Sequence, residues 1–192
     1  MDDLKNIGIL ASGSGSNAEN IIQHFQNSDV ARVAVVVTNN PNAGVIDRAK
    51  KYGVEVKVVG NADLDSDLLK VLKLHNVDVV ALAGFLRMIP MNVIQAYPGH
   101  ILNIHPALLP KFGGKGMYGM NVHKAVKEAG ETHSGMTIHL VTENYDEGTR
   151  LFQARTPIDS HDTAEDIASK VLQLEHKYYP RIIEAICQQQ LV

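Results

Sequence analysis

The first hundred residues alternate short apolar runs with amphipathic stretches, and this alternation limits most strongly what the chain can fold into. Two of the runs, Val33–Val37 and Val79–Ala83, are apolar at successive positions, as expected of strands that are covered by helices on both faces. Strands that alternate with helices pair in parallel through crossover connections. The pattern predicts a doubly wound, mostly parallel α/β sheet.

The periodicity also predicts individual elements. Strands are expected at Asn6–Ala11, Arg32–Thr38, Glu55–Val59, Val77–Ala83, Ile101–Ile104, Met136–Val141 and Phe152–Thr156. Helices are expected at Ala18–Gln26, Gly44–Tyr52, Ser66–His75 and Val122–Ala129. A long C-terminal helix should begin near Thr163, with Asp166 at capping-box spacing, and Pro180 should kink it. Because no repeat or linker interrupts the chain, residues 1–192 are expected to form one domain.

Composition excludes several functional classes. The chain carries 18 Lys and Arg against 21 Asp and Glu, a net charge of −3, so no overall positive field draws it to nucleic acid or to a membrane surface. Its longest apolar stretches fall well short of the ~20 residues of a membrane span. Residues 1–3 do not begin a signal peptide. The single cysteine, Cys187, cannot form an internal disulfide, which suits a reducing compartment, so a cytoplasmic location is expected. The expected partners are small molecules.

A glycine-rich loop, Ser12-Gly13-Ser14-Gly15-Ser16-Asn17, joins the first expected strand to the first helix. We call Ser12–Asn17 the phosphate loop, because glycines let the backbone approach a ligand and helix-start amides favour a phosphate. Taken alone, such a loop is as often a tight turn that caps the helix as it is a phosphate-binding site. Its position after a parallel strand favours the ligand site.

The same loop fits a loose dinucleotide fingerprint, which would make the chain a dehydrogenase. That class needs an acidic residue near the end of the second strand for the ribose hydroxyl. The chain has Thr38-Asn39-Asn40-Pro41 there. A mononucleotide phosphate is therefore the favoured ligand.

A second polar pair lies at the end of the strand that precedes Pro106. Asn103 and His105 are two positions apart, so they project from the same face. An amide can donate to a developing oxyanion, and an imidazole can carry a proton near neutral pH. The pair suits acyl transfer, although either residue alone would more often be a satisfied polar strand end.

Asp146 follows in a loop near the end of the chain's sixth expected strand. If its carboxylate meets His105, the opposite charge should raise the histidine's pKa and orient the ring. No histidine has the spacing of a zinc motif, so no metal is expected. No serine occupies a nucleophile elbow, which leaves direct transfer without a covalent intermediate.

Taken together, these motifs resemble the formyltetrahydrofolate-dependent formyltransferases. The resemblance rests on motifs that occur in the family's order along nearly the whole chain: Ser12–Asn17, Leu82–Arg87, Asn103–Pro106, Thr137–His139 with Asp146–Gly148, Glu175-His176 and Tyr179-Pro180. It implies a Rossmann-like fold. It also implies transfer of a formyl group from 10-formyltetrahydrofolate to the amine of glycinamide ribonucleotide in purine (IMP) biosynthesis.

The resemblance further implies roles for particular residues. Asn103, His105 and Asp146 match the catalytic trio, in which Asn103 and His105 stabilise the oxyanion and Asp146 keeps the imidazole charged. The expected ribonucleotide-binding residues are Gly15, Ser16, Asn17 and Glu175. The expected folate-binding residues are Leu86, Arg87, Met88, Ile89, Asn103, Thr142, Glu143, Asn144, Tyr145 and Asp146.

Several features depart from the family pattern, and two of them concern ligand binding. The segment Lys111–Asn121 is longer and richer in glycine than usual, so its role does not transfer. The stretch Asn61–Asp67 contains no arginine, although related enzymes can use one there near the glutamate tail of the folate.

The chain is expected to be a monomer or a homodimer.

Three other functions are alternatives to the one that the resemblance implies. A formyltetrahydrofolate hydrolase shares the trio but adds an N-terminal regulatory domain. A methionyl-tRNA formyltransferase would need a C-terminal RNA-binding domain and a basic surface. A catalytically silent mononucleotide-binding module would keep the phosphate loop, and its mark would be loss of His105.

Overall fold

The computed structural model describes residues 4–189; residues 1–3, on which the expectation about a targeting segment rests, lie outside this range. A single seven-stranded sheet forms the centre of the fold, in the order β3-β2-β1-β4-β5-β6-β7. The strands are β1 (Lys5–Leu10), β2 (Ala31–Thr38), β3 (Val56–Val58), β4 (Val79–Leu82), β5 (Ile101–His105), β6 (His133–Leu140) and β7 (Arg150–Pro157). All seven expected strands are present, with ends shifted by a few residues.

Six of the strands run in the same direction, and β6 alone runs the opposite way. β1 pairs in parallel with both β2 and β4, while β5–β6 and β6–β7 are antiparallel pairs. The chain runs from β1 outward through β2 to β3 and then returns to build β4 and β5 on the other side. Ligands of such sheets bind at this reversal, beyond the carboxyl ends of the strands.

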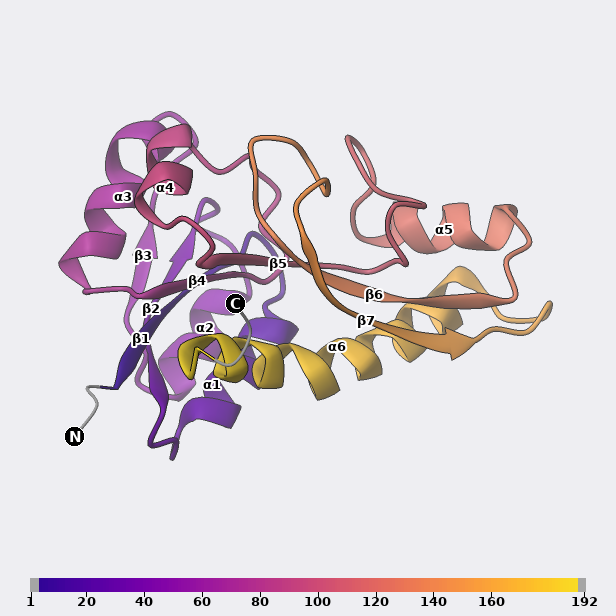
Figure 1. Ribbon diagram of the computed structural model, residues 1–192, viewed down its shortest axis with the longest axis horizontal. Helices are drawn as coiled ribbons and strands as arrows, with labels where there is room; N and C mark the ends of the chain where they lie inside the picture. The colour runs from indigo at the N-terminus through magenta and orange to yellow at the C-terminus, as the bar shows by residue number, and fades with distance from the viewer. Residues whose placement is uncertain (1–3, 190–192) are drawn as a thin grey trace.

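Six helices accompany the sheet: α1 (Ser16–Phe25), α2 (Val45–Lys51), α3 (Leu64–Leu74), α4 (Met91–Ala96), α5 (Met120–Glu128) and α6 (Ala164–Cys187). Figure 1 shows α1, α2 and α6 below the sheet and α3 and α4 above it. Two apolar cores follow from this, one with Ile21, Val45 and Val171 and the other with Leu68 and Val93. The helices thus cover both faces, as the apolar strands predict.

Helix α4 is the one element that the sequence analysis did not predict. It has six residues and follows Pro90, and fewer than two turns are too short to show a helical period. The other helices match the expected ranges closely. Helix α6 begins with the expected capping box between Thr163 and Asp166, and it continues through Pro180 without a break.

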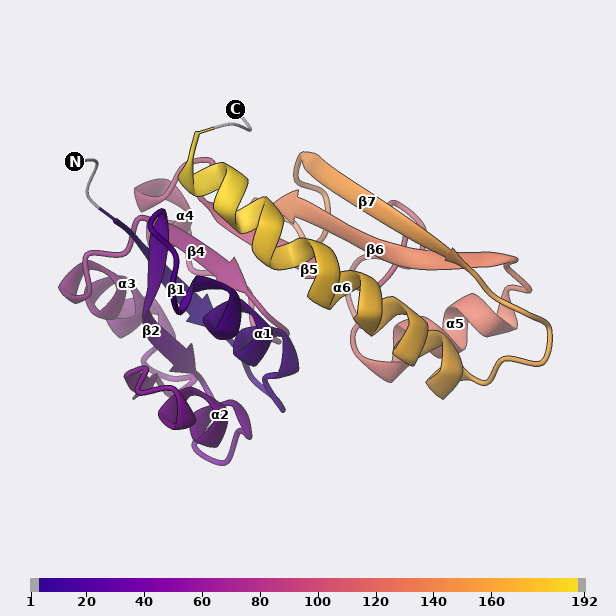
Figure 2. The same cartoon turned by 90° about the horizontal axis from the view of Figure 1, so that it is seen from below.

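Helix α6 crosses the sheet from its amino end near α5 to its carboxyl end near β4 (Figure 2). The hydroxyl of its fully buried Tyr179 donates to the carbonyl oxygens of Leu82, at 2.9 Å, and Leu102, at 3.1 Å. These residues belong to β4 and β5. The helix is therefore anchored close to the strand ends that carry the polar residues.

Candidate functional site

The phosphate loop follows β1 and packs against the start of α2. Gly15, the residue before α1, has φ 80°, in the left-handed region, and a Cβ atom there would lie 2.5 Å from Cβ of Val45. The amide of Val45 donates to the carbonyl of Gly13 at 3.2 Å, and Nε of Arg48 donates to the carbonyl of Ser14 at 2.8 Å. Only glycine fits at position 15.

Glu175 reaches the same region from α6. Its carboxylate is buried, with 7% of the residue exposed, and accepts a hydrogen bond of 2.7 Å from Nδ2 of Asn17. Burial raises the pKa of Glu175 to about 7, against a smaller lowering effect of the bond from Asn17. Two of the expected ribonucleotide-binding residues, 158 positions apart in sequence, therefore touch.

Asn103 projects from β5 toward the neighbouring strand. In the β5–β6 register it lies opposite His139, and its Nδ2 is 3.0 Å from Nε2 of that ring. The same Nε2 lies 3.4 Å from Oδ1 of Asp146, and Nδ1 of the ring lies 2.9 Å from the carbonyl oxygen of Leu140. One N–H of the Asn103 amide is thus anchored, and the second can serve a ligand.

His105 and Asp146 meet, as the sequence analysis proposed. Oδ2 of Asp146 lies 3.5 Å from Nδ1 of His105, and Oδ1 lies 3.4 Å from Nε2 of His139. Nε2 of His105 donates to the carbonyl of Phe112 at 2.7 Å. Both nitrogens of this buried ring therefore face hydrogen-bond acceptors.

The pKa values of this pair differ in part from expectation. Burial lowers the pKa of His105, and although the Asp146 carboxylate and the Phe112 carbonyl raise it, the net direction is down. The Asp146 carboxylate thus raises the pKa of His105, as expected, but desolvation has the larger effect in the site without substrates. Burial also opposes ionisation of Asp146, but the contacts with His139, His105 and the Gly114 amide outweigh it and hold the pKa of that carboxyl low.

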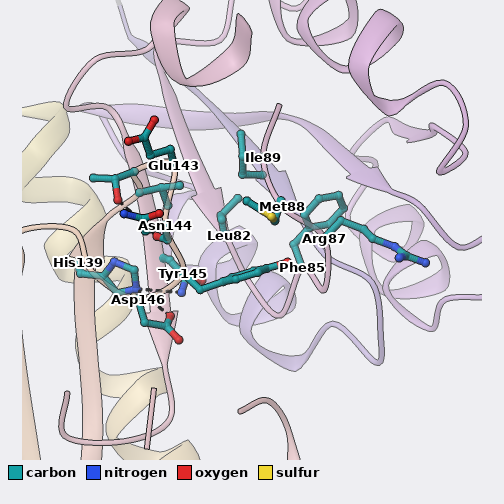
Figure 3. Close-up of a pocket in the computed structure, with 13 residues that line it drawn as sticks. Leu82, Phe85, Arg87, Met88, Ile89, His139, Glu143, Asn144, Tyr145 and Asp146 are labelled. Carbon is teal, nitrogen blue, oxygen red and sulfur yellow. Dashed lines mark hydrogen bonds and ion pairs between the residues drawn. The ribbon is translucent and has the colours of Figure 1, made fainter. Parts of the chain in front are cut away.

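Two cavities meet at these residues. One is a narrow pocket between the loop after β4 and the loop after β6 (Figure 3), lined by Arg87, Met88, Ile89, Asn103 and residues 142–146 among others. The other is a cavity of about 740 Å³ that extends past His105 to Ser14, Asn17 and Glu175. Asn103 and Asp146 line both. A group held in one cavity could therefore react with a group held in the other.

The structure distributes the expected binding residues unevenly. Nine of the ten expected folate-binding residues line the narrow pocket. Leu86 does not; it is 52% exposed and lines the larger cavity. The Arg87 side chain points away from the other labelled residues in Figure 3. Of the expected ribonucleotide-binding residues, Asn17 and Glu175 line the larger cavity, whereas Gly15 and Ser16 form the start of α1.

Sequence reasoning assigned no role to two residues that belong to this site. His139 anchors Asn103, and the buried His123 of α5 lines the larger cavity. The alternation of β6 shows that His139 shares a face with Thr137, but only knowledge of which strand lies beside β6 would have paired it with Asn103. His123 carried no local signal.

Two further observations concern residues 4–189. Within them, no helix combines the length and apolar character needed to cross a membrane. Among the same residues, no three His, Cys, Asp or Glu side chains gather in a way that could hold a metal ion.

Comparison with known proteins agrees with this architecture. A family profile described as "Formyl transferase" matches residues 5–183. The chain is 43% identical to phosphoribosylglycinamide formyltransferase, chloroplastic, of Arabidopsis thaliana, over 97% of the chain and 67% of that protein. It is 38% identical to phosphoribosylglycinamide formyltransferase of Bacillus subtilis, over 95% of each. The chain thus spans about two thirds of the plant relative and nearly all of the bacterial one.

A solved structure gives the same result. The crystal structure of glycinamide ribonucleotide transformylase 1 from Symbiobacterium toebii superposes with a TM-score of 0.91 at 34% sequence identity, over 100% of this chain and 92% of that one. The family profile covers most of the chain, and the fold and sequence likeness extend over its whole length. The chain belongs to the formyl transferase family.

Proposed function

We propose that this protein transfers the formyl group of 10-formyltetrahydrofolate to the amine of glycinamide ribonucleotide, a step of purine biosynthesis. The observation that carries the proposal is the junction of the two cavities, since Asn103 and Asp146 line both. The names of the relatives from Arabidopsis thaliana and Bacillus subtilis support the same acceptor.

In this proposal the larger cavity takes the ribonucleotide. The amides at the start of α1 face its phosphate, which the positive end of the helix dipole also favours. Asn17 and Glu175 are already hydrogen-bonded to each other and reach the sugar end. The pterin of the donor enters the narrow pocket, where the backbone of residues 142–146 supplies polar groups and Met88 and Ile89 supply apolar contact.

The reaction follows from where the donors lie. The amine attacks the formyl carbon and gives a tetrahedral intermediate whose oxygen carries negative charge. The second N–H of Asn103 donates to that oxygen, and the charge raises the pKa of His105, which burial holds low. The oxyanion therefore favours the protonated, positively charged form of His105. The carbon–nitrogen bond to the folate breaks as the amine gives up a proton and the folate nitrogen gains one.

The first test is an assay with a 10-formylfolate analogue whose deformylated product absorbs light. Product that forms only in the presence of glycinamide ribonucleotide supports the transferase. Product that forms without the ribonucleotide would instead indicate a hydrolase, and no product at all would leave a silent binding module.

A second test is His105→Ala. Loss of the group that responds to the oxyanion should lower kcat by about 10²- to 10³-fold, while the Kd of the ribonucleotide changes little. Stopped-flow kinetics and equilibrium binding measure the two effects separately. Wild-type turnover in this variant would contradict the mechanism.

A further inference from the structure

The glycine-rich segment after β5 contains contacts that the proposed reaction does not yet use. Its later residues, from Gly114 to Met120, line the larger cavity. The backbone of Phe112–Gly114 also contacts His105 and Asp146, which we call the catalytic pair. We call Phe112–Gly114 the loop base.

The backbone of the loop base bonds to both members of the pair. The carbonyl of Phe112 accepts from Nε2 of His105 at 2.7 Å. Two residues later, the amide of Gly114 donates to Oδ2 of Asp146 at 2.9 Å. The same Oδ2 lies 3.5 Å from Nδ1 of His105, so the imidazole, the carboxylate and the loop base form a closed ring of contacts.

The chain that leads into the loop base is fixed to the sheet. The amide of Leu109 donates to Oγ1 of the buried Thr137 at 3.0 Å. Its carbonyl accepts from Nη1 of Arg150 at 2.9 Å and from Nε2 of Gln153 at 3.0 Å. Because β6 and β7 supply these three partners, the sheet fixes the backbone at Leu109, three residues before the loop base begins.

Gly113 packs closely against the side chains of Leu109 and Asp146. A Cβ atom there would lie 2.5 Å from Cδ2 of Leu109 and 3.3 Å from Cβ of Asp146. Phe112 before it has φ 57°, a left-handed conformation that is uncommon for a residue with a side chain. The strained backbone at Phe112 and the close packing at Gly113 place the Phe112 carbonyl next to His105 and the Gly114 amide next to Asp146.

We propose that Phe112–Gly114 is a positioning element for the catalytic histidine: the Phe112 carbonyl holds the ring proton on Nε2 and the Gly114 amide holds Asp146 against Nδ1. The inference rests on the proposed function, in which His105 responds to the oxyanion. With an acceptor at each nitrogen, the ring can take a second proton without moving. The loop base thereby prepares His105 for the charge that the transition state favours.

The titration of His105 gives a readout that does not depend on activity. The titratable groups around this ring are Asp146, His139 and His123. The Phe112 carbonyl raises the pKa of His105 against the effect of burial. Loss of that contact should lower the pKa and free the proton to exchange between the two nitrogens, which side-chain ¹⁵N NMR detects.

The test is Gly113→Ala, whose new methyl group meets the side chains of Leu109 and Asp146 and so presses on the loop base. We expect kcat to fall about 10- to 100-fold, as for a small misplacement of a catalytic group, with the KM of each substrate changed less than about threefold. The His105 signals, assigned by their absence in His105→Ala, should titrate at lower pH. A matched control is Gly53→Ala, since Gly53 has φ 71° with nothing within 4 Å of a Cβ atom.

A rescue separates positioning from damage to the fold. Leu109→Val removes Cδ2, the atom nearest the added methyl group, so Gly113→Ala with Leu109→Val should regain most of the lost kcat and the wild-type titration. Wild-type kcat and titration in Gly113→Ala would overturn the proposal. So would a loss of activity with an unchanged His105 titration, or a double variant no better than the single one. If the wild-type enzyme transfers no formyl group but Gly113→Ala still shifts the titration, the proposed function fails while the positioning contact stands.

Discussion

At the scale of single residues, the site places a carboxylate whose pKa is lowered beside a histidine whose pKa burial lowers. A further negative charge near His105 would favour its protonated form. The oxyanion of the proposed reaction would supply that charge. The pair is thus better suited to the transition state than to the site without substrates.

Replacement of Asp146 by Asn tests this coupling. Asp146 has φ 57°, which Asn tolerates, so the loop should keep its shape. The Asp146 carboxylate is the strongest influence that raises the pKa of His105 against burial. Without it, that pKa should fall further. The limb of the pH–rate profile that reports His105 should move to lower pH, with kcat reduced about 10²-fold or more. Glu147→Gln, the same change at an exposed neighbour, should leave the profile in place; coincident profiles for Asp146→Asn and wild type would show that the two groups do not interact.

Glu175 should make stability depend on pH. Its pKa is about 7 in the folded protein against 4.5 for an ordinary glutamate. Because the folded value is raised, its favourable contribution is complete below pH 4.5 and is lost as pH rises toward 7 and above. The loss amounts to about 3 kcal/mol at most.

Glu175→Gln should remove this part of the pH dependence. Urea denaturation from pH 5 to 8, without ligands, should give a flatter stability curve for the variant than for wild type. Glu165→Gln changes an exposed residue on the same helix and should keep the wild-type slope. Parallel curves for Glu175→Gln and wild type would rule out a raised pKa.

At the scale of elements, the phosphate loop depends on α2 for its shape. The amide of Val45 and the guanidinium of Arg48 bond to carbonyls in the loop, and Val45 fills the space beside Gly15. These contacts leave the amides at the start of α1 free to face a phosphate. The loop is therefore held from outside the cavity as well as by its own glycines.

Gly15→Ala tests this arrangement. The left-handed φ alone should cost about 1–2 kcal/mol of unfolding free energy, and the clash with Val45 adds to it. The shifted loop should also raise the KM for the ribonucleotide while the KM for the formyl donor stays near its wild-type value. Thermal denaturation and steady-state kinetics measure both. Gly53→Ala has a similar φ without the clash, so it should lose less stability and keep both KM values; equal effects in the two variants would argue against the α2 contact.

At the scale of the whole molecule, α6 joins the substrate region to the centre of the sheet. Four residues of this helix line the larger cavity, and the last of them is Glu175. One turn later, Tyr179 bonds to β4 and β5. The position of the carboxylate therefore depends on how the helix is attached to the sheet.

Tyr179→Phe should weaken that attachment. The variant leaves two buried carbonyl oxygens without the hydroxyl, which should lower the free energy of unfolding by about 1–3 kcal/mol. Chemical denaturation gives the value. Tyr178→Phe is the matched control, because the Tyr178 ring packs against Phe152 and its hydroxyl makes no hydrogen bond among the described residues. A loss no larger for Tyr179→Phe than for Tyr178→Phe would contradict the proposed anchor.

Local patterns predicted much of this protein. Successive apolar positions in β2 and β4 indicate strands buried on both faces, and a glycine-rich loop between a strand and a helix indicates where a phosphate could bind. The period of two in β5 places Asn103 and His105 together. Such signals can be read from a sequence because each depends on only a few neighbouring residues. The six residues of α4 carried no such signal.

The tertiary structure decided the contacts and charges of the site. It brought His139 to Asn103, Phe112 to His105 and Asn17 to Glu175, pairs that no local pattern connects. It also set the direction in which the pKa of His105 moves, because that direction is the balance between burial and nearby charges contributed by several elements. By itself the sequence determined the kind of sheet and which of its ends carries the chemistry; which side chains touch there, and in which protonation state, followed only from the packing of distant segments.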